Sequence, residues 1–514
     1  MKSSIKKTLE NLLGPSRVAV DPVNRALYCR DMMSGSTLEM KAGLHPHLPD
    51  LICWPETTEE VSKIVRTANH HKIPVIPFGG GSGVSGGTLP LRGGIMIDLK
   101  RMASLETIKR VDDPYPHYVA TIQSGILGEH LERKLNERGY TLGHFPSSIL
   151  CATLGGYLAA RSAGQLSSRY GKIEEMVEDL EAVLPLGTIV PFGGRIKKYP
   201  EVAPKEILVG SEGTLGIITR ARMRIHPMAP AARYRGISFN SLSSALRAIR
   251  NIMQTGLRPS VIRLYDELDS LLLKYGYEAD DRKKTGKKFL SEFPYLSSLK
   301  ENAFHALLHH PDWIQTLFQL APAECLLIIG FEGDADFIRH QEKEALKICK
   351  ERIARDLGEK PGLHWLKKRY SVSFKMPDLL EKDCFVDTIE VAATWDRLEA
   401  LYEGVRRELK KQCLVLAHFS HAYSEGCSIY FTVIGHTGSA RKNLESYRQV
   451  WRKAMGATLA AGGTISHHHG IGLLKAEWLA QELGGAMRFF KRIKKELDPH
   501  NFMNPGKMGL EMMG

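Results

Sequence analysis

Short apolar runs and amphipathic stretches alternate near the start of the chain, and the alternation predicts strands joined by a helix. After a strand that begins at Leu51, apolar residues recur at helical spacing on one face, at Val61, Ile64, Val65 and Ala68. The stretch Thr57–Glu60 before them is a candidate capping box, which places the start of the helix there. Two short apolar runs follow, Val75–Phe78 and Ile95–Leu99, and each predicts a buried strand.

The same patterns continue beyond residue 100. Tyr118–Ile122 predicts a strand and Leu127–Arg138 a helix. Leu180–Val190 is strand-like, with a proline and a glycine at a hairpin turn. Leu208–Ile218 is a glycine-punctuated segment that we expect between two apolar strands.

Pro227 and Pro230 mark the first domain boundary. Residues 231–455 alternate strands and amphipathic helices without a glycine-rich loop, which predicts a second, mixed domain. It contains an insertion at about residues 280–320, where the basic run 282–288 precedes several apolar residues. Two interpretations stay open: a solvated loop followed by a helix packed into the core, which we favour, and a contact with a membrane surface.

Composition narrows the class of protein without identifying it. The chain has 514 residues, of which 43% are hydrophobic and 25% charged, as in an ordinary soluble enzyme with two or more domains. Its formal charge of +13 favours anionic partners, but no nucleic-acid-binding module accompanies the charge, so we expect no nucleic-acid partner. The eight cysteines are scattered without a CxxC pair, which predicts reduced thiols in the cytoplasm. The sequence contains no run of about 18 apolar residues, the length needed to span a bilayer.

A glycine-rich loop joins the predicted strands Val75–Phe78 and Ile95–Leu99. Six of nine consecutive residues are glycine, a density that costs backbone entropy and suits N–H groups that converge on a phosphate. Gly81, Gly83 and Gly86 spell GxGxxG, but a Rossmann fold needs a helix directly after this motif. A second strand follows instead, which argues against that fold. The alternative, a glycine-rich surface turn, is disfavoured by the two flanking strands.

Three adjacent histidines near the C-terminus, His467–His469, are candidates for acid–base chemistry. Neighbouring side chains cannot all point in one direction, so at most one or two face a cavity. An imidazole suits proton abstraction from a carbon next to a carbonyl, and Tyr430, in an alternating segment, could contact the same substrate oxygen. No cysteine or carboxylate stands at ligand spacing, so we expect no metal. A purely structural role for the histidines stays open.

Four ordered segments resemble the FAD-binding fold of the vanillyl-alcohol-oxidase (PCMH) type: the glycine-rich loop, CATLGGYLAARSAGQLSSRYGKIEEMV, LVGSEGTLGIITRARMRIHP and the closing NPGKM. The resemblance implies an α+β fold, with a two-subdomain PCMH-type FAD-binding domain and a mixed α/β cap domain for the substrate. It divides the chain into a leading segment (1–48), the FAD-binding domain (49–228), the cap domain (229–455) and a C-terminal segment that completes the flavin site (456–514). We expect the leading segment to be irregular after an amphipathic start.

The resemblance also implies where FAD binds. The glycine-rich loop would hold the pyrophosphate, a second set of residues would lie along the cofactor, and a third would line its adenine end. In chain order these residues are Phe78, Gly79, Gly80, Gly81, Ser82, Gly83, Val84, Ser85 and Gly86, then Pro146, Ser147, Thr153, Gly155, Gly156, Ser162 and Gly164, and finally Glu212, Gly213 and Ile218. Relatives with covalent flavin carry a histidine in or near this loop. The loop has none here, so we expect non-covalent FAD.

Within this family the segment SHHHGIG is similar to the alkylglycerone-phosphate synthases and their bacterial relatives. That resemblance implies a flavin-N5-mediated exchange of an acyl for an alkyl group on acyl-dihydroxyacetone phosphate, a step of ether-lipid synthesis. It implies His468 and Tyr430 as the acid–base pair, and the full set of catalytic residues is His468, Tyr430, Arg263, His467 and His469. The alternative is an FAD-linked oxidase or dehydrogenase of a 2-hydroxy acid such as D-lactate or glycolate.

One departure from the family pattern bears on the substrate. The family usually has an arginine in a PYLRD-like segment shortly before TWDR, and Met376 stands near that place here. Lys375 is the nearest replacement, although lysine does not offer phosphate a bidentate fork. The expected partner is a small-molecule substrate, phosphorylated and lipid-like. A peripheral membrane contact and a homodimer remain open.

Overall fold

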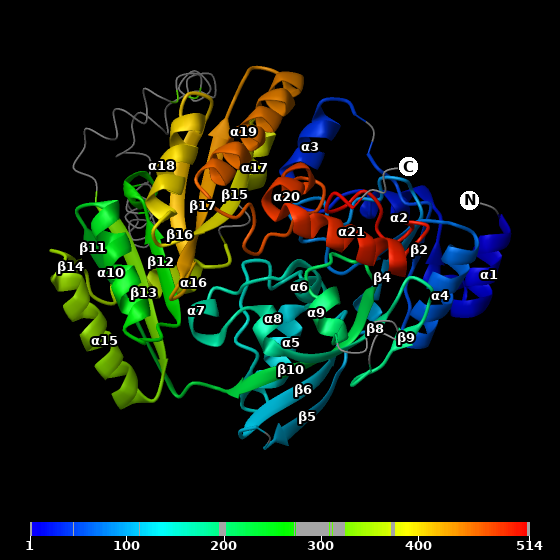
Figure 1. The fold of residues 1–514 in the computed structure, drawn as a ribbon, viewed down its shortest axis with the longest axis horizontal. Coiled ribbons are helices and arrows are strands. Elements are labelled where there is room, and N and C mark those ends of the chain that lie inside the picture. Colours follow the sequence, from blue (N-terminus) through cyan, green and yellow to red (C-terminus); the bar gives the residue numbers. More distant parts are fainter. Residues whose placement is uncertain are drawn as a thin grey trace, which may run out of the picture.

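Three β-sheets organise the described part of the chain in the computed structural model (Figure 1). The structure describes residues 3–510 except 45, 113, 195–201, 272, 274–307, 309–310, 312–323 and 372–375. The basic run 282–288, on which the membrane-contact interpretation rests, therefore lies outside the described residues, and so does Lys375. Within the described part, no helix is long and apolar enough to cross a membrane.

The first sheet carries the glycine-rich loop. The strand order is β1-β2-β4-β3, and β2, β4 and β3 run parallel. The bounds are β1 (Val18–Ala19), β2 (Leu51–Cys53), β3 (Val75–Phe78) and β4 (Ile95–Asp98). The 3-10 helix η2 (Leu99–Arg101) follows β4. Helix α4 (Thr58–His70) packs against α1 (Ser3–Leu13) in a common apolar core. Thr57 caps α4 by accepting from the N–H of Glu60, while the Glu60 carboxylate accepts from the N–H of Glu56 and not of Thr57. The predicted order of strand, helix and two strands is confirmed.

The second sheet has the order β5-β6-β10-β8-β9, and β7 pairs with β10. Its bounds are β5 (Leu105–Val111), β6 (His117–Gln123), β7 (Tyr140–Thr141), β8 (Val177–Val183), β9 (Ile189–Val190) and β10 (Ile217–Pro227). Its helices are α5 (Gly128–Asn136), α6 (Leu154–Ala160), α7 (Ser167–Tyr170), α8 (Ile173–Met176) and α9 (Pro204–Leu208). The strand, helix and hairpin predicted between 118 and 190 are confirmed. The strand expected just before the glycines of 208–218 is wrong, because Pro204 opens a helix whose first turn suits its fixed φ.

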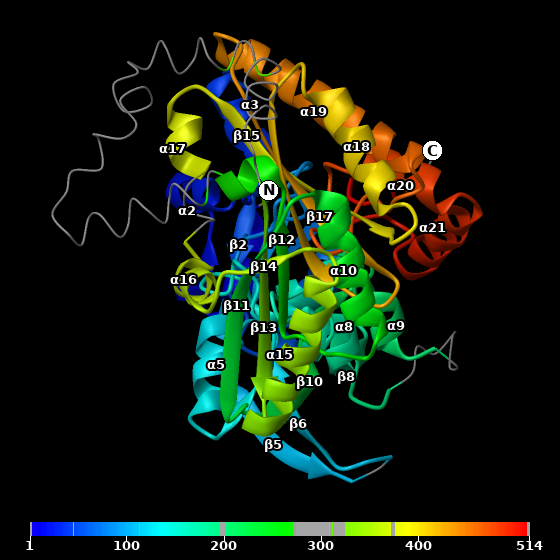
Figure 2. The same cartoon turned by 90° about the vertical axis from the view of Figure 1, so that its left-hand side faces the viewer.

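The third sheet is antiparallel throughout, in the order β14-β11-β13-β12-β16-β17-β15. Its bounds are β11 (Ala231–Phe239), β12 (Val261–Tyr265), β13 (Cys325–Gly333), β14 (Arg355–Asp356), β15 (Phe385–Thr394), β16 (Leu414–Ala422) and β17 (Gly426–Gly435). One face packs on α10 (Leu242–Gln254), α15 (Ala335–Lys350), α18 (Leu398–Leu409) and α19 (Ala440–Ala460) (Figure 2). Beyond the sheet, away from these helices, lie α16 (Lys360–Lys368) and α17 (Met376–Glu381).

Side-chain alternation gives the third sheet a polar row on the face away from α10, α15, α18 and α19. Ile429 and Phe431 belong to the large apolar core, so Tyr430 between them points to the opposite face. Tyr430 stands in register with His418 on β16 and with Glu390 on β15. The sheet thus brings side chains that are far apart in sequence into one row.

The first 48 residues are more ordered than expected. The amphipathic start forms α1, but η1 (Pro15–Arg17), β1, α2 (Pro22–Leu27) and α3 (Ser34–Lys41) follow, and β1 joins the first sheet. Between α2 and α3 the N–H of Met32 donates to the carbonyl of Gly83, 2.9 Å away in the glycine-rich loop. The prediction of irregular chain is therefore wrong for this part of the segment.

The C-terminal segment returns to the first sheet. Helices α20 (Ala476–Leu483) and α21 (Gly485–Leu497) lead into a final stretch beside β3. There the N–H of Val75 donates to the carbonyl of Phe502 (2.8 Å), and the N–H of Asn504 donates to the carbonyl of Val75 (2.7 Å). These bonds place the closing NPGKM next to the strand that carries the glycine-rich loop.

Candidate active site

The glycine-rich loop packs tightly against the segment that the sequence places along the cofactor. A Cβ on Gly79 would lie 2.2 Å from Thr153 Oγ1, and a Cβ on Gly80 would lie 1.7 Å from the carbonyl oxygen of Cys151. Neither position has room for a side chain, and only glycine lets the two backbones approach this closely.

The C-terminal segment is fastened to this region by side-chain hydrogen bonds. Ser85 in the loop donates to the carbonyl of His469 (3.2 Å). The Glu212 carboxylate accepts from the N–H groups of Ile471 (2.5 Å) and Gly472 (2.7 Å). Burial raises the pKa of Glu212 to about 7, and these two donors oppose the rise. Glu212, expected at the adenine end, thus also holds the chain directly after the three histidines.

The closing NPGKM holds the same region from the other side. The Asn504 amide donates to the carbonyls of Gly87 (2.8 Å) and Glu212 (2.7 Å), and the buried Lys507 ammonium donates to the carbonyl of Leu89 (2.8 Å). The first and last motifs of the resemblance therefore meet in space. Ile218, by contrast, is buried in the apolar core of the second sheet.

Polar side chains and backbone groups of residues 144–165, here called the polar wall, lie next to the glycine-rich loop. Ser162 lies 3.1 Å from His144 Nε2, and the N–H of Gly155 donates to the carbonyl of Ser124 (2.7 Å). A Cβ on Gly164 would lie 2.5 Å from the backbone nitrogen that follows His144. Ser147 accepts a hydrogen bond from the Gln165 amide at 3.3 Å.

The residues present fit a large polar cofactor. Ser124 Oγ and His144 Nδ1 are buried in this wall, and neither has a hydrogen-bond partner among the described residues. Buried polar atoms normally have a partner, so the wall offers groups that a bound ligand can satisfy. Together with Gly79 and Gly80, where Thr153 and Cys151 leave no room for a Cβ, this supports a site shaped for FAD.

The predicted acid–base pair is in direct contact. Tyr430 Oη lies 2.5 Å from His468 Nε2, and it also lies 3.0 Å from Nε2 of His421. His469 meets the Tyr430 ring edge-on at 5.3 Å between centroids. His467 Nδ1 lies 2.9 Å from His468 Nδ1. His468 and His469 therefore contact Tyr430, whereas His467 reaches it through His468, and neighbouring rings are nearly perpendicular.

A buried carboxylate that sequence reasoning missed lies beneath the histidines. Glu390 is 0% exposed and accepts hydrogen bonds from the backbone N–H groups of His467 (2.9 Å), His468 (3.4 Å) and His469 (3.3 Å). Its Oε1 lies 3.5 Å from His468 Nδ1, and its Oε2 lies 3.8 Å from the buried ammonium of Lys475. Burial alone would raise the pKa of Glu390, but the charge of His468, its hydrogen bond and Lys475 hold that pKa well below its ordinary value. Glu390 is therefore an anion at neutral pH.

Three imidazoles of the cluster have strongly lowered pKa values. Burial and, after it, a proton on His468 lower the pKa of His467 to about 3. The same two causes, in the same order, hold the pKa values of His421 and His469 well below their usual range. These three rings are neutral at pH 7, and His468 is the ring that faces Glu390.

Arg263 joins the site through a second missed residue. Its Nη2 donates to His418 Nε2 at 2.8 Å, so this nitrogen of His418 is unprotonated and Nδ1 carries the hydrogen. That Nδ1 lies 3.5 Å from a carboxylate oxygen of Asp269. The His418 ring stacks on Tyr430 at 4.7 Å between centroids, so Arg263 reaches the acid–base pair through one imidazole. A histidine in an alternating strand, in register with Tyr430, was the available signal.

The sequence argued against a metal site because no carboxylate stands at ligand spacing. The fold corrects that argument, because it brings a carboxylate next to two of the histidines. Ligand atoms of Glu390, His467 and His468 all lie within 4.8 Å of one another. The carboxylate already accepts three backbone N–H groups, however, and the positive charge of Lys475 opposes a cation there. We propose no metal at this point.

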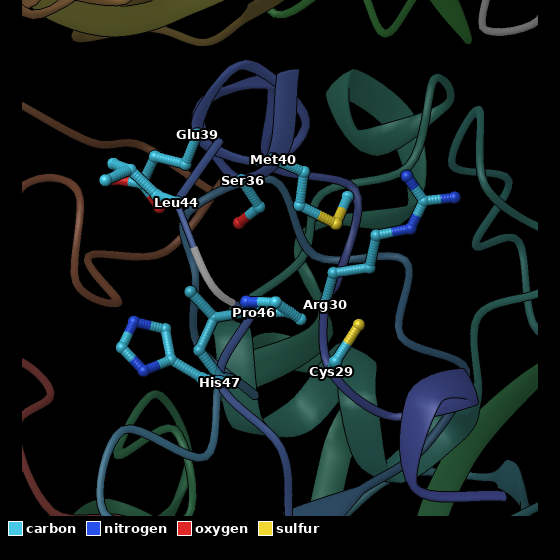
Figure 3. Close-up of a pocket in the computed structure, with 9 residues that line it drawn as sticks. Cys29, Arg30, Ser36, Glu39, Met40, Leu44, Pro46 and His47 are labelled. Carbon is cyan, nitrogen blue, oxygen red and sulfur yellow. The ribbon is translucent and has the colours of Figure 1, made fainter. Parts of the chain in front are cut away.

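A separate hollow lies in the N-terminal part of the chain (Figure 3). It is lined by Cys29, Arg30, Ser36, Glu39, Met40, Leu44, Pro46, His47 and Leu89. None of these belongs to the implied cofactor-binding or catalytic residues, so we assign the hollow no role in the reaction.

Comparison with known families identifies the two halves of this site. An FAD binding domain matches residues 49–193, and the C-terminal domain of FAD linked oxidases matches residues 228–508. The chain belongs to the FAD-linked oxidase family. It is an FAD-dependent enzyme, and the likeness in fold and cofactor inferred from its four motifs is confirmed.

Relatives within the FAD-linked oxidase family include two synthases. The chain is 30% identical to the alkyldihydroxyacetonephosphate synthase of Dictyostelium discoideum, over 96% of this chain and 79% of that protein. It is 29% identical to the Trypanosoma brucei brucei synthase, over 99% and 81%. A solved alkyldihydroxyacetonephosphate synthase structure superposes with a TM-score of 0.74 at 27% identity, over 98% of this chain and 85% of that one. The mitochondrial cytochrome D-lactate dehydrogenase of Arabidopsis thaliana is 27% identical over 90% and 74%.

The sequence predicts that this enzyme binds FAD non-covalently. The glycine-rich loop contains no histidine that could bond to the flavin. Purified protein should be yellow, and acid precipitation should leave FAD in the supernatant. Flavin that remains in the protein pellet would contradict non-covalent binding.

Proposed function

We propose that this enzyme exchanges an acyl for an alkyl group on a phosphorylated, acylated three-carbon ketone, as the alkyldihydroxyacetonephosphate synthases do. The substrates would be acyl-dihydroxyacetone phosphate and a long-chain alcohol, and the products the alkyl ether and a fatty acid. The observation that carries this choice is the 30% identity to a synthase over 96% of the chain.

The acid–base work would fall to Tyr430 and His468. A base at this pair would take a proton from the substrate carbon beside the carbonyl and later supply a proton to the product carbon. The 2.5 Å contact lets the hydroxyl and the imidazole share that proton, and the Glu390 carboxylate beneath them would balance the positive charge that His468 gains with it. Bound FAD would supply an electrophilic centre that can hold the three-carbon fragment during the exchange. The proton of the alcohol would leave with the fatty acid. Because one oxygen substituent replaces another on the same carbon, the exchange gains and loses no electrons overall.

Arg263 would meet the anionic part of the substrate. Its guanidinium lies over the Tyr265 ring, 5.4 Å from the centroid, and its Nη2 is held by His418. Its Nε is buried and has no hydrogen-bond partner among the described residues, so it can donate to a phosphate oxygen. Lys375, a second candidate for the same phosphate, lies outside the described residues.

The alternative is oxidation of a 2-hydroxy acid, which the similarity to a D-lactate dehydrogenase suggests. The same base could remove a hydroxyl proton while hydride passes to the flavin, and Arg263 could bind a carboxylate. A lipid-like substrate would also suit a peripheral membrane contact. That contact, a homodimer and the cytoplasmic location stay predictions of the sequence.

Net electron transfer separates the two reactions. Holoenzyme mixed without oxygen with acyl-dihydroxyacetone phosphate and radiolabelled hexadecanol should form labelled ether lipid and end with oxidised flavin. D-Lactate and glycolate should leave the flavin spectrum unchanged. Persistent bleaching by either acid, without labelled ether from the alcohol, would contradict the proposal and support the alternative.

A further inference from the structure

A continuous series of hydrogen bonds leads away from the acid–base pair. Beyond Tyr430, His421 Nε2 lies 3.0 Å from the tyrosine hydroxyl, and His421 Nδ1 lies 2.8 Å from Ser167 Oγ. The Tyr423 hydroxyl donates to Ser167 Oγ at 3.0 Å. With the 2.5 Å bond to His468, the series joins the C-terminal segment, β17, β16 and the FAD-binding part of the chain at α7.

A β-bulge places His421 in this series. The register of β16 with β17 shifts between Ser420 and Ala422, which leaves His421 as the extra residue. Its φ of 53° is left-handed, a conformation that histidine rarely adopts. A bulge turns a side chain away from simple alternation, and here the imidazole reaches the Tyr430 hydroxyl on the polar face. Strict alternation could not place both His418 and His421 beside Tyr430.

The series can carry a proton because every member both donates and accepts. In one arrangement Tyr423 donates to Ser167, Ser167 to His421 Nδ1, His421 Nε2–H to Tyr430, and Tyr430 to His468. When His468 Nε2 holds the proton, every donor reverses, and His421 changes from the Nε2–H to the Nδ1–H tautomer. When a proton passes outward from His468, Tyr423 receives the proton of Ser167 and releases its own hydroxyl proton to solvent, so the two arrangements differ by one proton at His468. Each link breaks one O–H or N–H bond and forms another, and no charge stays in the middle.

We propose that His421, Ser167 and Tyr423 form a proton relay between the Tyr430–His468 pair and the surface. The outer end lies at Tyr423, which is half-buried and is followed by the exposed Ser424 and Glu425. The relay deepens the proposed function, because it gives the proton taken from the substrate a path to solvent. The charged and titratable groups around it are Glu390, Lys475, Arg263, Lys172, Glu174, Glu175, His467 and His469.

The kinetic test compares two neighbouring serines on α7. Ser167→Ala removes the central link, whereas Ser168 makes no side-chain hydrogen bond to any described residue, so Ser168→Ala is the matched control. We expect Ser167→Ala to lower kcat at least about tenfold with little change in KM, because proton transfer at a positioned group contributes factors of this size or larger. Tyr423→Phe, which keeps the ring, should lower kcat in the same direction. Added imidazole should restore part of the loss, which a merely structural defect would not allow.

A second readout needs no substrate. In holoenzyme labelled with ¹⁵N-histidine, the ring shifts of His421 should change from the Nε2–H to the Nδ1–H pattern as the pH is lowered. In Ser167→Ala the His421 pattern should stay fixed. A single His421 tautomer at every pH in the wild type, or equal kcat in the two serine variants, overturns the relay. If the wild type shows no synthase turnover, the proposed function fails, and the tautomer measurement decides the relay alone.

Discussion

Replacing Tyr430 by phenylalanine is expected to lower kcat by about 10²- to 10⁴-fold, the range of a positioned acid–base group. The hydroxyl is the atom that contacts both His468 and His421, and phenylalanine removes it without opening a cavity in the sheet. His468→Gln should lower kcat to a similar degree. The double variant should be no slower than the worse single variant, because the two groups act as one unit.

Tyr234→Phe is the matched control for this loss. Tyr234 stands on β11 of the same sheet, and its hydroxyl donates to Glu332 (2.8 Å), outside the histidine cluster. Removing it should leave kcat within about twofold, as expected of a change outside the reacting groups. FAD content should be the same in all variants. Full activity in Tyr430→Phe would show that the pair does no acid–base work.

Replacing Glu390 by glutamine is expected to destabilise the holoenzyme by about 3–5 kcal/mol, the usual cost of removing one partner from a buried charge pair. The change leaves the ammonium of Lys475, which is 1% exposed, without its counter-charge, and it weakens the acceptor of three backbone N–H groups. Urea unfolding of the wild type and the variant measures the difference. Glu425→Gln, at an exposed glutamate in the turn between β16 and β17 of the same sheet, should change stability by less than about 0.5 kcal/mol.

The pH dependence of this difference follows from the depressed pKa of Glu390. Its pKa in the folded enzyme lies well below its ordinary value of 4.5, so its contribution to stability is fully present above that value. The contribution is lost as the pH falls through the folded pKa. The gap between wild type and Glu390→Gln should therefore be constant from neutral pH down to about 5 and shrink in stronger acid. A gap that grows on acidification would contradict the assignment of Glu390 as the buried anion.

Local patterns in the sequence predict much of the fold. The spacing of Val61 to Ala68 fits one face of a helix, and the run Val75–Phe78, bounded by the glycine-rich loop, has the length and composition of a buried strand. Both elements are where they were expected. The segment before Leu208 was misjudged because its apolar residues fit a strand and a short helix equally well. The helices of the first 48 residues have mixed composition, and β1 is held by its partner β2, which local pattern does not reveal.

The sequence predicted only those residues of the candidate site that lie in a recognisable motif. His467–His469 and Tyr430 stand out by clustering and alternation, but Glu390 lies inside an apolar strand, 78 residues before His468. The register of β15 with β17 and the bridge between Ala392 and Thr464 bring it beneath the histidines. His421 depends on a bulge and on a left-handed φ, and Ser167 comes from helix α7 in the FAD-binding part of the chain. Such long-range pairings are set by packing, and no local period encodes them.

The most direct test of the central claim is the number of turnovers that each flavin supports without an electron acceptor. Holoenzyme given acyl-dihydroxyacetone phosphate and labelled hexadecanol under strict anaerobiosis should form many molecules of ether product per FAD, with one fatty acid released for each and with flavin that ends oxidised. A reaction that stops after one turnover per FAD and leaves reduced flavin would contradict substituent exchange and assign the enzyme to net oxidation.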